Sequence, residues 1–309
     1  MGSSPPAFPP REQAPVRGEP GSDPQLLAPE AGLNPPPPEP VRKPRPSWSY
    51  APATYVLLGI NCLVFLAMTV REVSIWSPTT DQLMYFGADN AGAVLIGGQW
   101  WRIVSAMFVH VGIVHLATNM WCLWNLGLLA EPLMGSAGVV AVYILTGAAG
   151  NLLSTCVNWF WYNKDWVKYH AEWASHHAGL ALDPTIVFPV GAGASGAVFG
   201  IAGALIVLLK SHRLPVPPLE LHKLRRSVIY FAAINLVIGF SISFGTRIIG
   251  SGLQIDNMAH LGGFTCGLLF AAPMVPRIGS PRKLFLLRRR VATVMVVGIL
   301  VLFGVFLAK

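Results

Sequence analysis

The chain has 309 residues, of which 53% are hydrophobic and only 12% are charged. Soluble domains carry about 25% charged residues, so this composition excludes an ordinary soluble enzyme and indicates a helical protein that crosses a membrane several times. The net charge of +8 does not indicate nucleic-acid binding, because the basic residues gather in short loops between apolar segments, as they do in membrane proteins.

The first 50 residues are polar and rich in proline, with a run of four prolines at 35–38. Such a segment buries no core, so we expect residues 1–50 to be disordered. It has no apolar stretch of the kind that a cleavable signal peptide requires. Arg42, Lys43 and Arg45 end the segment and predict that it lies in the cytoplasm.

Seven apolar segments follow, and each is expected to form a membrane-spanning helix. They cover residues 55–70, 111–130, 138–157, 194–210, 227–244, 258–274 and 291–308. The fold class is therefore all-α and polytopic, with a six-span core at 51–276 and a basic loop plus a seventh helix at 277–309. A loop rich in aromatic residues and histidine is expected at 158–189. The four cysteines lie in apolar segments and are read as small buried residues rather than as disulfides.

The distribution of basic residues predicts the orientation. The loops at 210–226 and 277–290 hold 11 of the 22 Lys and Arg residues, and both fall on the side of the N-terminus. That side is then the cytoplasm. Short loops and the missing targeting signal favour a multi-pass protein of a bacterial cell membrane.

Polar residues occur near the outer ends of three predicted spans. His115 and Asn119 lie in the second span, Ser195 in the fourth and His260 in the sixth. Ionisable side chains at membrane depth cost free energy and are functional candidates. His115 and Asn119 are four residues apart and share a helix face. We therefore expect three helices to place these groups around one pocket that water can reach.

Small residues accompany Ser195 and His260. They are Gly193, Gly196 and Gly200 around the serine, and Gly263 and Gly267 after the histidine. By itself a serine in such a cluster favours a plain packing face of a membrane helix. If the glycine faces of the two helices meet, however, His260 is brought beside Ser195.

This pair of residues suggests nucleophilic catalysis. A serine hydroxyl is a weak nucleophile and needs a neighbouring base, here His260, to take its proton. His115, the Asn119 amide and the backbone N–H of Ser195 are candidate donors for the oxyanion. Asp256 stands four residues before His260, but it reads better as the N-cap of the sixth span. The sequence therefore predicts a Ser–His dyad.

With these motifs in place, the sequence resembles the rhomboid family of intramembrane serine proteases over about residues 55–272. The motifs that carry the resemblance are Trp101-Arg102, the run His110, His115 and Asn119, Glu131 with Gly135, Gly193-Ala194-Ser195-Gly196, and Ala259-His260-Leu261-Gly262-Gly263 with Gly267.

The resemblance implies a rhomboid-like six-helix bundle, here with a seventh helix. It also implies that Ser195 is the nucleophile, His260 the base, and His115 and Asn119 the oxyanion donors. It further implies a reaction that uses no metal and no cofactor. The expected substrates are transmembrane proteins, cut in or near their membrane segments within the lipid bilayer. Phe199 stands where some relatives have tyrosine; it can stack on His260 but cannot donate a hydrogen bond.

Other functions remain as alternatives. The first is a catalytically inactive rhomboid-like protein that binds or chaperones membrane clients, and such relatives typically lack the serine or the histidine. The second is a transporter, which would need interrupted helices and a site at the midplane. His170, His176 and His177 suggest metal binding only weakly, because this spacing is more often found in interfacial loops. The substrate and the oligomeric state stay open.

Overall fold

The computed structural model describes residues 51–176, 183, 187–210, 217–249, 256–274 and 281–308, without the side chains of 174–176, 236 and 238–249. The described residues all belong to one compact unit, Arg45–Lys309. The expected disordered tail at 1–50 lies outside the described residues.

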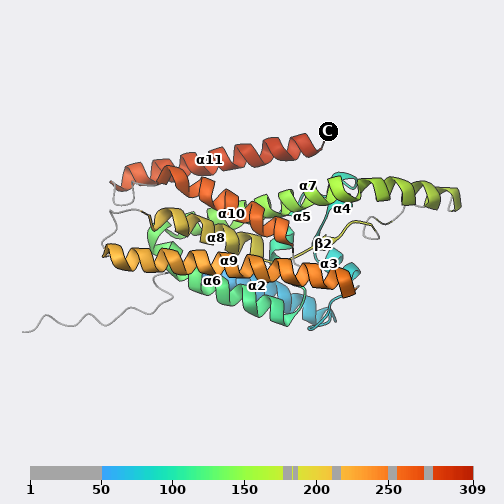
Figure 1. The fold of residues 1–309 in the computed structure, drawn as a ribbon, viewed down its shortest axis with the longest axis horizontal. Coiled ribbons are helices and arrows are strands. Elements are labelled where there is room, and N and C mark those ends of the chain that lie inside the picture. The colour runs from blue at the N-terminus through green and yellow to red at the C-terminus, as the bar shows by residue number, and fades with distance from the viewer. Residues whose placement is uncertain are drawn as a thin grey trace, which may run out of the picture. The chain divides into compact units, whose positions relative to one another are not determined.

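This unit consists mainly of helices, with two short strands (Figure 1). The elements are α2 (Pro52–Val70), α3 (Thr80–Tyr85), β1 (Asp89–Asn90), α4 (Ala91–Leu95), α5 (Arg102–Ser105), η1 (Ala106–Phe108), α6 (Ile113–Met134), α7 (Ser136–His176), β2 (Val190–Gly191), α8 (Ser195–Leu208), α9 (Pro218–Ile249), α10 (Asn257–Ala271), η3 (Ala272–Met274) and α11 (Arg282–Leu307).

The predicted membrane protein is confirmed, but the predicted count of six plus one spans is not. Within the described ranges, four helices are long and apolar enough to cross a bilayer, namely α2, α6, α7 and α11. Helix α8 is apolar but has only 14 residues, and α10 has 15. A span perpendicular to the bilayer needs about 20 residues, so α8 and α10 are short for this purpose.

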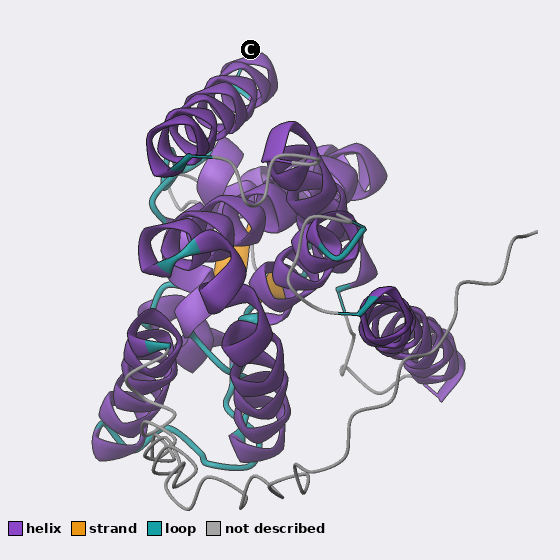
Figure 2. Ribbon diagram, turned by 90° about the vertical axis from the view of Figure 1, so that its left-hand side faces the viewer, coloured by secondary structure: helices purple, strands orange, loops and turns teal. Residues whose placement is uncertain are grey.

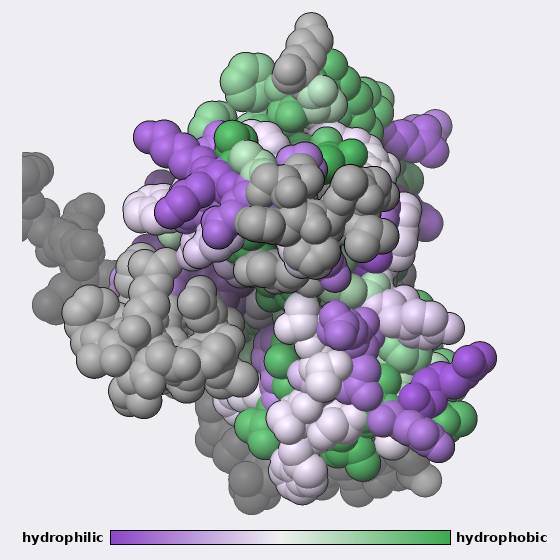
Figure 3. Space-filling model, turned by 90° about the vertical axis from the view of Figure 1, so that its right-hand side faces the viewer, coloured by the Kyte–Doolittle hydropathy of each residue, from purple (hydrophilic) through white to green (hydrophobic). Residues whose placement is uncertain are grey.

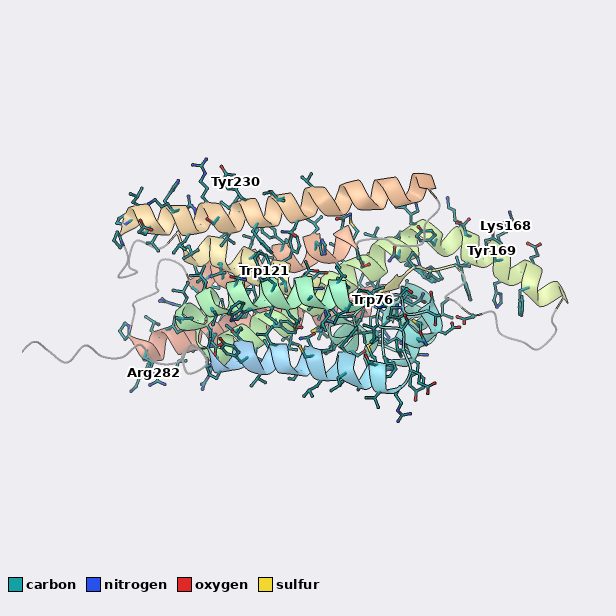
Figure 4. All side chains as sticks on the ribbon, turned by 90° about the horizontal axis from the view of Figure 1, so that it is seen from below. Trp76, Trp121, Lys168, Tyr169, Tyr230 and Arg282 are labelled. Carbon is teal, nitrogen blue, oxygen red and sulfur yellow. The ribbon has the colours of Figure 1, made fainter. Side chains whose placement is uncertain are left out.

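The third span was predicted to end near residue 157 and to lead into a loop, and this prediction was wrong. Helix α7 continues to His176 and has 41 residues. No glycine or proline occurs between 151 and 176, so the change to polar residues marks an exit from the apolar layer rather than a helix end. Figure 4 shows the extension, with Lys168 and Tyr169, projecting beyond the other helices. Figure 3 views this end of the unit, where hydrophilic residues gather among apolar ones.

Two predicted basic loops are also partly helical. Helix α9 begins at Pro218 and α11 at Arg282, several residues before the spans were expected to start. Lys223, Arg226 and Arg289 therefore lie on helical turns rather than in loops. The charged residues are good helix formers, so composition alone did not mark where these helices begin.

Helix α8 lies at the centre of the unit. It packs against α6, α7, α9 and α10, and most of its residues are buried. Figure 2 looks along the bundle and shows α9 at one side of it. A ring contact joins α9 to α8, with the centroids of Phe231 and Phe199 6.4 Å apart. Large apolar side chains on α9 are exposed, including Ile229 and Ile234, as expected for a surface that faces lipid.

The two strands fix the chain just before α8. Strand β1 pairs antiparallel with β2, and Asp89 lies opposite Gly191. The Asn90 side chain donates to the carbonyl of Phe188 at 2.7 Å. The backbone N–H of Gly193 donates to the carbonyl of Ala106 at 2.9 Å. The segment that leads to Ser195 is thus held by residues about 100 positions earlier.

Glu131 of α6 caps a helix other than its own. Its carboxylate accepts the backbone N–H groups of Ala53 at 2.9 Å and Thr54 at 2.8 Å, together with the Thr54 hydroxyl. Ser136 donates to the same carboxylate at 2.6 Å. The N-cap of α2, Ala51, has no side-chain acceptor, and the first N–H groups of a helix otherwise lack partners. Glu131 therefore joins the start of α2 to the end of α6.

We expect Glu131→Ala to destabilise the protein by about 3 kcal/mol or more, because hydrogen bonds to a charged group contribute ~1.5–3 kcal/mol each and their loss leaves buried donors unpaired. Thermal unfolding in detergent measures the effect. Glu220→Ala is the control, since Glu220 forms an exposed ion pair with Lys223 that contributes little. Equal unfolding temperatures for the two variants would contradict the capping role.

Candidate active site

The site is formed where α8 and α10 touch through their backbones. A side chain added at Gly263 would meet the carbonyl oxygen of Gly196, and one added at Gly267 would meet that of Gly200. The two glycine faces found in the sequence therefore lie against each other. Only residues without a β-carbon allow helices to approach this closely.

Ser195 is the first residue of α8, and its turn is set by the residues before it. Gly193 has φ +130, a conformation that side chains of other residues rarely allow. Ala194 is the N-cap and its carbonyl accepts the N–H of Val198 at 3.0 Å. Ser195 itself is partly exposed. The glycine at 193 thus turns the chain so that α8 begins at the serine.

His260 lies on the facing helix, α10, against a residue one helical turn after Ser195. Its ring stacks on Phe199, with centroids 4.3 Å apart and planes 11° from parallel. Phe199 is four residues after Ser195 and shares its helix face. His260 is 6% exposed, and its Nδ1 atom is buried without a hydrogen-bond partner. The stacking fixes the plane of the imidazole.

The two side chains do not form a hydrogen bond in this structure. In the part of the chain that the structure describes, Ser195 and His260 share none. Catalytic hydrogen bonds are often long or poorly aligned in the absence of substrate and tighten when it binds. The helix contact places their chain neighbours together, since a β-carbon at Gly196 would lie 3.2 Å from the carbonyl oxygen of Ala259.

His115 approaches the same turn from α6, and Asn119 follows it one helical turn later. A β-carbon at Gly193 would lie 2.5 Å from Cε1 and 3.0 Å from Nε2 of His115. The Nδ1 atom of His115 is buried without a hydrogen-bond partner. Asn119 is buried and donates one amide proton to the carbonyl of His115 at 3.0 Å. A side-chain amide has two protons, so one remains for another acceptor.

His110 holds the turn that precedes Ser195. It is fully buried, and its Nε2 accepts the backbone N–H of Ala194 at 3.4 Å. Its Nδ1 lies 3.3 Å from the carbonyl of Phe108, so Nδ1 carries the proton. Burial, together with His115, lowers the pKa of His110 to about 3. His110 therefore supports the turn that precedes Ser195.

The described part of the chain was expected to show clustered ligands if the loop histidines bound a metal. The described ranges contain no group of three or more His, Cys, Asp or Glu side chains placed to hold a metal. His170, one of the three histidines considered as ligands, lies against Trp166 with ring centroids 5.5 Å apart. The His176 side chain and His177 lie outside the described residues.

The sequence matches a known family over most of this region. A family model described as "Rhomboid domain" matches residues 97–277. The chain is 29% identical to "Rhomboid protease GluP" of Bacillus subtilis (strain 168) over 228 residues, which cover 74% of this chain and 36% of that protein. It is 29% identical to "Rhomboid protease AarA" of Providencia stuartii over 236 residues, 75% of this chain and 74% of that protein. It is 27% identical to "RHOMBOID-like protein 1" of Arabidopsis thaliana, with 66% and 42% coverage. The chain therefore spans about a third of the first relative and most of the second.

The contact between α8 and α10 gives a direct test. Gly263→Ala should lower the unfolding temperature, because its methyl group meets a backbone carbonyl rather than a flexible side chain. Overpacking of this kind costs about 1–3 kcal/mol. Gly59→Ala on α2, where an added β-carbon finds open space, is the matched control and should stabilise slightly through helix propensity. If both variants unfold like the parent, the helices are not in backbone contact.

Proposed function

The chain belongs to the rhomboid family, and on that basis we propose that it is a serine endopeptidase that acts inside the membrane. Its substrates are transmembrane proteins, and the bond that it hydrolyses lies in or near their membrane segments. Ser195 is the nucleophile and His260 the general base, without a third acidic member and without a metal or cofactor.

The dyad reaction follows from the chemistry of the two side chains. His260 takes the proton of the Ser195 hydroxyl as its oxygen attacks the scissile carbonyl. The same imidazole then gives this proton to the leaving amine, and an acyl-enzyme remains. Water, activated by His260, attacks the acyl-enzyme and releases the second product.

The oxyanion needs donors that are in place before the reaction. The Ser195 backbone N–H, the free Asn119 amide proton and the His115 ring are the proposed donors, each worth ~10²–10³ in rate. His115 lies against Gly193, two residues before the nucleophile, which supports this role. Phe199 supplies a flat surface for His260 but no hydrogen bond.

One observation carries the proposal. His260, buried in the unit, is stacked on Phe199 one helical turn from Ser195, on a helix in backbone contact with α8. A histidine needed only for packing would be expected to satisfy both ring nitrogens, whereas Nδ1 of His260 has no partner. The alternative is an inactive relative that binds membrane clients, and it would not require an activated serine.

Covalent labelling separates these two functions. A fluorophosphonate reacts with a serine whose oxygen is activated and whose adduct is stabilised. Purified wild-type protein should be labelled at Ser195, Ser195→Ala not at all, and His260→Ala at least about 10²-fold more slowly. His170→Ala is the control and should react at the wild-type rate. Cleavage of a single-span test protein in liposomes should follow the same order.

If the folded wild-type protein is not labelled and does not cleave the test protein, the protease function is contradicted and the client-binding function replaces it. Sensitivity of cleavage to a chelator would instead point to a metal mechanism.

We further propose that the protein lies in a cell membrane with its N-terminus and its basic segments, 210–226 and 277–290, in the cytoplasm. A contact supports placing the second segment at the inner end of α6, because Arg289 donates to the carbonyl of Met134 at 3.3 Å. The site then opens toward the outer face of the membrane.

Cysteine labelling in intact cells tests this orientation. In a background with Cys62→Ala, new cysteines at Lys223 and Lys283 should resist a membrane-impermeant maleimide, whereas one at Asp81 should react. These three positions are exposed, so permeabilised cells should label all of them. Labelling of the first two in intact cells would reverse the topology.

A further inference from the structure

Two acidic side chains, Asp89 and Asp256, both lie close to Gly191 and have no role in the dyad reaction. Asp256 is the N-cap of α10, as the sequence predicted, and its Oδ1 accepts the N–H of Ala259 at 2.9 Å. Its Oδ2 accepts the hydroxyl proton of Ser154 on α7. Its backbone carbonyl accepts the N–H of His260 at 3.2 Å. Asp256 therefore holds the turn of α10 that carries the proposed base, and fastens it to α7.

Asp89 reaches the neighbouring residue of α7 from the other side. Its Oδ2 accepts the hydroxyl proton of Thr155 at 2.9 Å, next to Ser154. Asp89 is 4% exposed, and its Oδ1 is buried without a hydrogen-bond partner. A buried carboxylate oxygen without a donor is costly when it is charged, so the site favours a proton on Asp89.

The two carboxyl groups come together at Gly191 in β2. A β-carbon at Gly191 would lie 3.4 Å from Oδ2 of Asp256 and 3.8 Å from Cβ of Asp89. Strand β2 lies beside the start of α10 (Figure 1) and runs toward Ser195. The carboxyl pair, Asp89 and Asp256, thus lies between the strand that leads to the nucleophile and the helix that carries the base.

Few charges face the carboxyl pair. From α5, Arg102 acts on Asp89 at a distance, while its Nη1 donates to the carbonyls of Met84 and Ala88. Helix α7 contributes neutral groups, the hydroxyls of Ser154 and Thr155 and the amide of Asn158. Strand β2 contributes Val190 and Gly191, and α4 only apolar residues. On α10, His260 follows one turn later. Within the described residues, Asp256 is therefore the negative charge that acts on Asp89.

The protonation of the carboxyl pair then changes within the physiological range. Burial, with a contribution from Asp256, raises the pKa of Asp89 to about 7, although Thr155 and Arg102 lower it in part. Burial also raises the pKa of Asp256, against the hydrogen bonds from Ser154 and from the backbone. Near neutral pH a small rise in pH therefore removes the proton from Asp89 and makes the pair more negative.

We propose that the carboxyl pair positions His260 and does so in a proton-dependent way. With a proton on Asp89, Asp256 caps α10 and holds the proposed base in register with Ser195. When both carboxyl groups are charged, their repulsion separates β1 and β2 from the start of α10, and His260 moves away from the serine. This inference rests on the proposed function only for its effect on catalysis.

The direction in which pH changes stability follows from the raised pKa of Asp89. The folded-state pKa of Asp89 is above its ordinary value of 3.8. Its stabilising contribution is therefore fully present below pH 3.8 and is lost as the pH rises through about 7. The alkaline side of neutrality should weaken both the fold around the pair and the reactivity of Ser195.

The test compares the full-length protein in detergent with Asp89→Asn, which keeps an acceptor for Thr155 and removes the charge. Asp165→Asn, at an exposed position on α7, is the matched control. Two quantities are measured between pH 5.5 and 9: the rate of fluorophosphonate labelling at Ser195 and the apparent unfolding temperature.

In the wild type and in Asp165→Asn, labelling should fall at least about threefold as the pH rises above 7. The unfolding temperature should fall over the same upper range. In Asp89→Asn both declines should disappear. If Asp89→Asn does not fold, Asp256→Asn serves in its place, because asparagine can still cap the helix and accept from Ser154.

The inference is overturned if the charge-removing variant retains the alkaline decline in labelling and in unfolding temperature. It is also overturned if the wild type shows no such decline in either quantity. A wild type that is never labelled but loses stability above pH 7, in a way that Asp89→Asn abolishes, would refute the proposed function and leave the carboxyl pair in place.

Discussion

The contact between the backbones of α8 and α10 is the constraint on which the rest of the site depends. Carbonyl oxygens of Gly196 and Gly200 occupy the space where β-carbons of Gly263 and Gly267 would lie. In a membrane there is little hydrophobic force between helices, so association relies on close packing and hydrogen bonds. Because the helices touch, a residue at the start of one reaches a residue in the first turns of the other.

Polar contacts between distant segments surround this pair of helices and fix its surroundings. Glu131 holds the start of α2, while the Asn61 amide donates to the Tyr143 hydroxyl at 2.9 Å and joins α2 to α7. The Asn151 amide donates to the carbonyl of Ile103 at 2.9 Å and joins α7 to α5. Hydrogen bonds of this kind replace the water that the bilayer lacks. They give helices that are apolar on all sides a defined rotation about their axes.

In the site, the backbone turn and the His260 ring are held by close contacts, while some buried ring nitrogens have no hydrogen-bond partner. His110 and Phe199 hold the serine turn and the imidazole by contacts that are complete. The ring nitrogens of His115 and His260, by contrast, include buried atoms without partners. Such orphaned atoms are rare in folded proteins and cost free energy, so they gather where a substrate, water or proton is expected to complete them. The unpaired oxygen of Asp89 belongs to the same class, but it lies behind the site rather than in it.

The sequence by itself determined the features that depend on local composition and spacing. The apolar segments predicted a helical membrane protein. The glycines near Ser195 and His260 predicted which helix faces pack together, and the position of Asp256 predicted a helix cap. Tertiary structure alone decided where α7 ends, because a helix without glycine or proline does not stop when it becomes polar. It also decided that Asp89 and Asp256 both lie beside Gly191. The two aspartates accept hydrogen bonds from adjacent hydroxyls on α7. Asp89 is 66 residues from Thr155 in the sequence, and Asp256 is 102 residues from Ser154. Contacts over such separations leave no periodic trace in a single sequence, since only the packing of the helices brings those positions together.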